Sequence, residues 1–203
     1  MALMSIDHDI AASAELLAEC NARINGATLG DSTRNRVSAA LLHLSLEHHG
    51  AIHLLISNEP HPHYGSAFAL LRPQFEGFVR GVWFHRCASE QELSKFIRGG
   101  EPARIDELIR ALETVPGYEE GLLKSTKQNV WRIMCGYAHG GSVQVASRMS
   151  ATEIAGNYTE QQVRELISLV CPITLLVSVA FAQLLDNNTM ANEFLSIYQR
   201  LFP

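Results

Sequence analysis

Arg132 and His139 are the residues of this chain whose types and spacing best suit a chemical role. They lie seven positions apart, almost two helical turns, so both side chains leave the same face of a helix. A guanidinium can bind phosphate through two parallel N–H donors, and an imidazole can gain or lose a proton near neutral pH. Gly140 and Gly141 follow at once and mark the end of that helix. The pair is the minimum equipment for metal-independent cleavage of RNA.

The alternative interpretation of His139 is structural, because a cation at a helix C-terminus interacts favourably with the helix dipole. The surrounding charges favour the functional interpretation. No acidic residue occurs between Glu120 and Glu153, although the window holds several cations. If this segment binds an anion, we expect His139 to act as general acid or base. The expected anion and base contacts are Arg132, Tyr137, Gln144 and Arg148.

A second charged group lies on the helix expected over residues 64–87. Arg72, Glu76 and Arg80 are spaced i, i+4, i+8 among large apolar residues, so they form one stripe on a largely buried helix. The stripe is either an ion triad that fixes helix packing, with Glu76 in support, or a cationic site in which Arg72 and Arg80 hold phosphate or carboxylate. Both interpretations stay open.

Histidines in the helix expected before residue 57 have metal-ligand spacing. His49 and His53 are four residues apart, and His43 shares that offset with Glu47. Such pairs also arise on solvated helix faces, and no His-Glu-x-x-His motif is present. We therefore expect a solvated face here and no metal site. Glycine-rich phosphate loops are absent from the sequence as well, and we expect no cofactor.

The composition bounds the class of protein. The chain has 203 residues, 47% of them hydrophobic, with a net charge of −5, which suits one globular domain and argues mildly against nonspecific coating of nucleic acid. Four cysteines lie far apart, which is typical of reduced thiols in a cytoplasmic protein. The uncharged segment 166–185 is long enough to span a membrane. Its polar residues and Pro172 favour a central core helix instead.

Apolar residues recur at spacings of three and four, and strand patterns are rare, so we expect an all-α, single-domain bundle of about seven to eight helices with long central ones. Residues 1–30 would form a helix and loop that could lie at the periphery, and 189–203 a C-terminal amphipathic helix. Residues 140–156 are expected to be a loop. The other helices are expected near residues 31–57, 64–87, 89–97, 102–115, 118–138 and 159–185.

Segments 69–84 (ALLRPQFEGFVRGVWF), 131–145 (WRIMCGYAHGGSVQV) and 157–160 (NYTE) resemble a bacterial all-helical family of unknown function. That family looks distantly similar to the HEPN (higher eukaryotes and prokaryotes nucleotide-binding) superfamily. HEPN ribonucleases carry an Arg-x(4–6)-His motif, which Arg132 and His139 match at its upper limit. The resemblance implies a HEPN-like, RNA- or nucleotide-interacting homodimer. It would be a metal-independent endoribonuclease of a defence or toxin–antitoxin system, with an antitoxin-type partner.

The resemblance would make His139 the general base for a ribose 2′-hydroxyl and Arg132 the stabiliser of charge on phosphorus. Ile133 departs from the pattern, because active members usually carry a polar residue directly after the arginine. Whether the chain is an enzyme stays open on this evidence. The alternative function is a non-catalytic binding or assembly module in which the Arg72–Glu76–Arg80 triad and His139 are structural.

Overall fold

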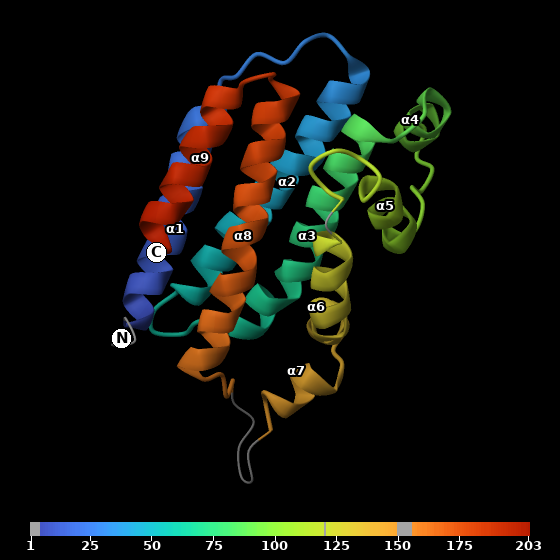
Figure 1. Ribbon diagram of the computed structural model, residues 1–203. Helices are drawn as coiled ribbons and strands as arrows, with labels where there is room; N and C mark the ends of the chain where they lie inside the picture. Colours follow the sequence, from blue (N-terminus) through green and yellow to red (C-terminus); the bar gives the residue numbers. More distant parts are fainter. Residues whose placement is uncertain (1–4, 120, 150–155) are drawn as a thin grey trace.

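The computed structural model describes residues 5–119, 121–149 and 156–203, and helices are the only regular elements longer than a single bridge residue in these ranges (Figure 1). An all-α fold is therefore confirmed. The helices are α1 (Ile6–Ile24), α2 (Thr33–Ile56), α3 (Tyr64–Arg86), α4 (Glu90–Ile97), α5 (Ile105–Leu112), α6 (Leu122–Ala138), α7 (Ser142–Ala146), α8 (Glu160–Leu184) and α9 (Asn188–Leu201).

The described part of the chain thus holds nine helices, one more than the expected upper number. The addition is α7, which occupies part of the segment expected to be a loop. That expectation was wrong for residues 142–146; residues 150–155 of the same segment lie outside the described ranges. Both expected capping boxes, at Ser89 and Thr159, are present and begin α4 and α8.

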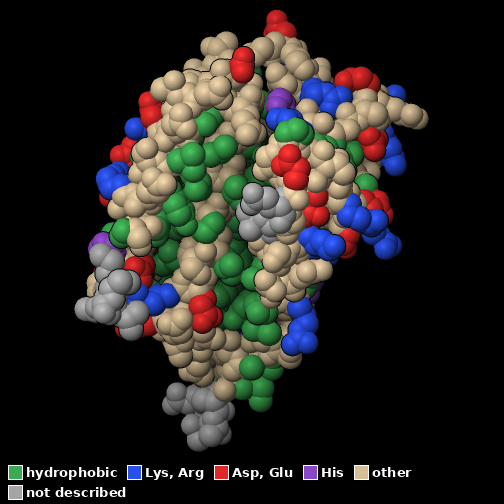
Figure 2. Space-filling model, viewed as in Figure 1, with side chains coloured by type: hydrophobic (Ala, Val, Ile, Leu, Met, Phe, Trp, Pro, Cys, Tyr) green, Lys and Arg blue, Asp and Glu red, His purple; other side chains and the backbone are tan. Residues whose placement is uncertain are grey.

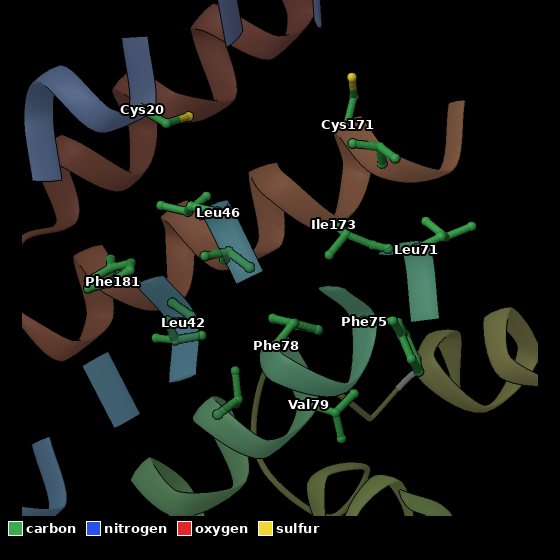
Figure 3. Packing of buried hydrophobic residues seen from close by; sticks show 14 of the residues in the cluster. Cys20, Leu42, Leu46, Leu71, Phe75, Phe78, Val79, Cys171, Ile173 and Phe181 are labelled. Atoms are coloured by element: carbon green, nitrogen blue, oxygen red, sulfur yellow. The ribbon is translucent and has the colours of Figure 1, made fainter. Parts of the chain in front are cut away.

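The α2–α3 pair forms the centre of the molecule, and two glycines allow these helices to approach closely. A Cβ at Gly81 would lie 2.8 Å from Leu42 Cγ, and one at Gly77 would lie 3.2 Å from the Leu41 carbonyl oxygen. Helix α8 packs across both helices, α1 and α9 cover its far side, and α6 packs on α3 (Figure 1). Apolar side chains from α2, α3 and α8 meet in the core, among them Leu42, Leu46, Leu71, Phe75, Phe78, Ile173 and Phe181 (Figure 3).

Helix α8 has the length and hydropathy of a membrane span, and 61% of its most apolar window is buried inside the molecule. Val170, Val177 and Ala182 are among its buried residues. The structure therefore places α8 as a core helix of the bundle, as its scattered polar residues indicate.

A chain of buried polar groups crosses this core and joins α1, α2, α3 and α8; we call it the polar seam. Ser13 Oγ lies 2.8 Å from His49 Nε2, and Thr174 Oγ1 lies 2.7 Å from His49 Nδ1. Gln74 Nε2 donates to Thr174 Oγ1 over 3.2 Å. His49 is wholly buried, so its expected place on a solvated face was wrong. Burial lowers its pKa to about 3, with a smaller contribution from His53.

Candidate anion-binding site

The charged stripe of α3 forms an ion triad at the edge of the core. Arg72 Nε donates to Glu76 Oε1 over 2.8 Å, and Arg80 Nη2 lies 2.9 Å from Glu76 Oε2. Both carboxylate oxygens are thus engaged, and Glu76 is the most buried of the three, with 16% of its side chain exposed. A carboxylate held between two guanidiniums neutralises one of them, so the triad keeps one positive charge in excess.

Arg72 connects this triad to α6. Its Nη1 contacts His139 Nε2, although the two residues are 67 positions apart in the chain. Arginine has only donors, so the imidazole nitrogen is the acceptor in this contact. The Arg72 guanidinium carbon also lies 4.9 Å from the centre of the Trp131 ring, within the range of a cation–π contact.

Lys127 extends the same arrangement toward α5. Its ammonium lies 4.9 Å from the Trp131 ring centre and forms an ion pair with Asp106. Asp106, Lys127, Trp131 and Arg72 thus form a continuous row from α5 across α6 to α3. The sequence analysis did not single out this row. Only the i, i+4 spacing of Lys127 and Trp131 is visible in the sequence, and the contacts to Asp106 and Arg72 depend on helix packing.

His139 lies directly after its helix and also contacts Arg72. It is the C-cap of α6, and Gly140 follows with φ of 65°. The amide of Gly141 donates to the Gly136 carbonyl over 2.8 Å, which completes a Schellman termination. The glycine pair therefore ends α6 as expected. Because His139 is exposed, this cap leaves its ring in reach of solvent.

Arg132 lies on α6 two turns before His139 and is exposed. Among the described residues it has no ion pair and no side-chain hydrogen bond. We call the part of the molecule that carries Arg72, Arg80, Lys127 and Arg132 the α3–α6 surface. Among the described residues these four cations pair with two carboxylates, Glu76 and Asp106, so the cations of the group outnumber their paired carboxylates by two.

Gln144 and Arg148 form a separate group beside this surface. Gln144 Nε2 donates to the Gly65 carbonyl over 2.8 Å and to the Tyr137 carbonyl over 3.0 Å. Arg148 Nη1 contacts the Gln144 side chain and lies 3.1 Å from the hydroxyl of Tyr158. These bonds attach α7 to the start of α3. The two side chains also line an open hollow of about 340 Å³ with Gly140 and Val145.

Tyr137 does not belong to an exposed anion site. Its side chain is buried, and its ring stacks on Phe68 with centroids 4.4 Å apart. Burial raises the pKa of its hydroxyl. The expected contact between Tyr137 and an anion does not fit this position; the residue instead packs the C-terminal turn of α6 onto α3.

The structure thus divides the expected site into parts. It joins Arg72, Glu76, Arg80 and His139 directly, keeps Arg132 as a separate exposed cation on the same helix, and gives Gln144 and Arg148 a cluster of their own. In the ranges described, no three His, Cys, Asp or Glu residues are arranged to hold a metal ion. An exposed imidazole beside guanidinium groups is suited to binding a phosphate or a carboxylate.

The chain belongs to a family of unknown function (DUF6988), which matches residues 42–202. The match begins within α2 and continues to the end of α9, so it includes every residue of the candidate site. No curated protein and no solved structure matches the chain.

Proposed function

We propose that this protein binds RNA or a nucleotide through its phosphate at the α3–α6 surface, as a HEPN-like protein would. The observation that carries the proposal is the contact between Arg72 and His139, which brings cationic and titratable groups from two helices to one exposed place. Arg132, which has no ion pair within the described ranges, would add a second phosphate contact on the same helix. Gln144 and Arg148, around the hollow beyond Gly140, would contact the next part of the ligand.

The catalytic form of this proposal is metal-independent cleavage of RNA. His139 would take the proton of a ribose 2′-hydroxyl, whose oxygen then attacks phosphorus while the 5′-oxygen leaves and takes a proton from solvent. The product is a 2′,3′-cyclic phosphate. Arg132 would stabilise the charge that develops on phosphorus. Because Arg72 occupies His139 Nε2, a bound phosphate has to draw Arg72 away before that nitrogen can act as the base.

The setting belongs to the same proposal. A cytoplasmic homodimer that acts in defence or in a toxin–antitoxin pair, with an antitoxin-type protein as its partner, would fit a phosphate-binding surface of this kind.

A second function is favoured by the engagement of both Glu76 oxygens and by Ile133, which follows Arg132. In this alternative the triad and the His139 cap are structural, and the protein is a non-catalytic binding or assembly module. This alternative predicts that loss of a triad side chain or of the His139 side chain changes the stability of the protein. It predicts no change in RNA binding or cleavage.

The test measures binding and cleavage separately. Binding of a fluorescein-labelled single-stranded RNA is followed by anisotropy, and cleavage of total RNA is followed in EDTA. His139→Ala should abolish cleavage and leave the fold unchanged by circular dichroism, whereas Arg132→Ala should weaken binding about 10-fold. Arg36→Ala is the matched control, because Arg36 is an exposed arginine on α2 paired with Asp31. Unchanged RNA binding in both site variants would refute the proposal, and binding without cleavage in the parent protein would leave only its non-catalytic form.

A further inference from the structure

Two adjoining hollows lie between α6 and α8, and we call them the α6–α8 hollows. Both helices pack on α3, but their contact with each other is slight, so a gap stays open between them. The hollows have volumes of about 260 and 400 Å³ and share the side chains of Leu71, Val130, Met134 and Leu169 among their walls. Figure 2 shows hydrophobic side chains along this gap, down the middle of the viewed face.

The two hollows follow one another along the helices. The smaller lies beside residues 123–134 of α6 and 168–176 of α8, and the larger beside 130–137 and 162–169. Their combined length is about 21 Å at the rise of a helix, which gives a mean cross-section of about 30 Å². A helix with its side chains is at least about 10 Å wide and does not fit into that section. The shape suits one extended chain, and the total volume is in the range of small-molecule sites.

The walls of the α6–α8 hollows are apolar along most of this length. Helix α6 contributes Leu123 and Val130, and α8 contributes Leu169, Pro172 and Leu176. The leucines and the valine belong to the core or pack against it. An aliphatic ligand that enters from water therefore gains affinity with each methylene group that it buries against these walls.

One carboxylate sets the charge that such a ligand can carry. Among the described residues that line the α6–α8 hollows, Glu165 holds the single charged side chain. It accepts a hydrogen bond from Gln161 Nε2 over 3.2 Å and has no ion pair in the described part of the chain. Its negative charge repels an anionic head group and attracts a cationic one.

Ser168 adds hydrogen-bond acceptors one turn further along α8. It lines both hollows, and its hydroxyl donates to the Glu165 carbonyl over 2.8 Å, so the lone pairs of Oγ remain for a ligand. Pro172 has no N–H, so the Ser168 carbonyl lacks the donor that a helix normally supplies from four residues on. Three kinds of acceptor oxygen thus lie within one turn of α8, and a head group with several N–H donors matches them.

We propose that the α6–α8 hollows bind an aliphatic chain that ends in a primary amine. Its ammonium lies at Glu165 and Ser168, and its hydrocarbon part extends between the helices toward Leu123. The site is separate from Arg72 and His139, so the proposal does not depend on RNA binding. A bound chain would fill the gap that separates α6 from α8.

The first test compares head groups on one chain length by isothermal titration calorimetry of the whole protein. Decylamine should bind at one site, and decanoate should bind at least about 10-fold more weakly, because attraction to Glu165 becomes repulsion. In Glu165→Gln this preference should fall below about 3-fold. Glu47→Gln is the matched control, because Glu47 is an exposed carboxylate on α2 that lines neither hollow. Equal preferences in the two variants would overturn the assignment of the ammonium to Glu165.

The second test locates the chain. The dissociation constant should fall about 4-fold for each methylene added from hexylamine to decylamine. Val130→Phe and Leu169→Phe place a ring in the hollows from opposite walls, and each should weaken decylamine binding at least about 30-fold in protein that is folded by circular dichroism. Leu54→Phe should leave it unchanged, because Leu54 is 71% exposed on α2 and lines neither hollow. The proposal is overturned by a parent chain that binds no decylamine at 1 mM, by equal affinities for hexylamine and decylamine, or by parental affinity in a folded phenylalanine variant of either wall.

Discussion

The neutral state of His49 predicts that the protein loses stability as the pH falls below 6.5. His49 is enclosed by the hydroxyls of Ser13 and Thr174, and burial lowers its pKa from 6.5 to about 3 in the folded chain. At pH values between these two pKa values, the unfolded chain therefore binds a proton at His49 and the folded chain does not. For a group with a depressed folded pKa of this kind, the contribution to stability is complete above pH 6.5 and is lost as the pH falls toward 3.

The size of the effect follows from the two pKa values. Each pH unit below 6.5 costs about 1.4 kcal/mol until the folded pKa is approached, so the free energy of unfolding should fall by about 2 kcal/mol between pH 7.5 and pH 5.0. Other histidines with lowered pKa values, His48, His53 and His85, act in the same direction. The contribution of His49 must therefore be measured as a difference between two proteins.

The assay is urea unfolding followed by circular dichroism at pH 7.5, 6.5, 5.5 and 5.0, at one protein concentration, for the parent chain and His49→Gln. The variant should be less stable at pH 7.5, because glutamine cannot meet both hydroxyls in the same geometry, but its stability should depend less on pH. Equal pH slopes for the two proteins would show that His49 does not carry the effect. A parent chain as stable at pH 5.0 as at pH 7.5 would refute the reasoning altogether.

Three further predictions concern packing, capping and charge. Gly81→Ala should destabilise the protein by about 2 kcal/mol in urea unfolding, because its methyl group would meet Leu42. Gly50→Ala, also within a helix but with only an ordinary contact, should instead stabilise it by about 0.5 kcal/mol. Ser89→Ala should lower the thermal midpoint through a loss of about 1 kcal/mol, since it removes the capping box of α4. Glu76→Gln should tighten binding of labelled RNA, because two guanidiniums lose their carboxylate; weaker binding would contradict that account.

Local signals in the sequence predicted the helices well. Ser89 and Thr159 begin helices where their capping boxes indicate, and the glycines after His139 end α6. Helix α7 was missed because it has five residues and no side-chain cap. What holds it in place is the bond from Gln144 to a carbonyl 79 positions away, which no local pattern contains.

The candidate site was predicted in part for the same reason. The i, i+4 spacing of the triad is local and appears as expected. The burial of His49 depends on Ser13 and Thr174, which are 36 and 125 positions away. The position of Tyr137 could have been predicted, because it follows Val130 and Met134 at helical spacing on the apolar side of α6.

The polar seam also decides how the helices are aligned along their lengths. Apolar neighbours tolerate a slide of one helix past another, since one aliphatic side chain can replace the next in a hollow. A hydrogen bond between two particular atoms does not tolerate such a slide, because the slide would separate the donor from the acceptor. Thr174 stands two positions beyond Pro172, which lines a hollow of about 260 Å³ between α6 and α8, so the bond from Thr174 to His49 fixes the height of α8 beside this hollow relative to α2. Leucines in place of the polar seam could preserve a helical bundle, but the hollow would lose its one defined shape.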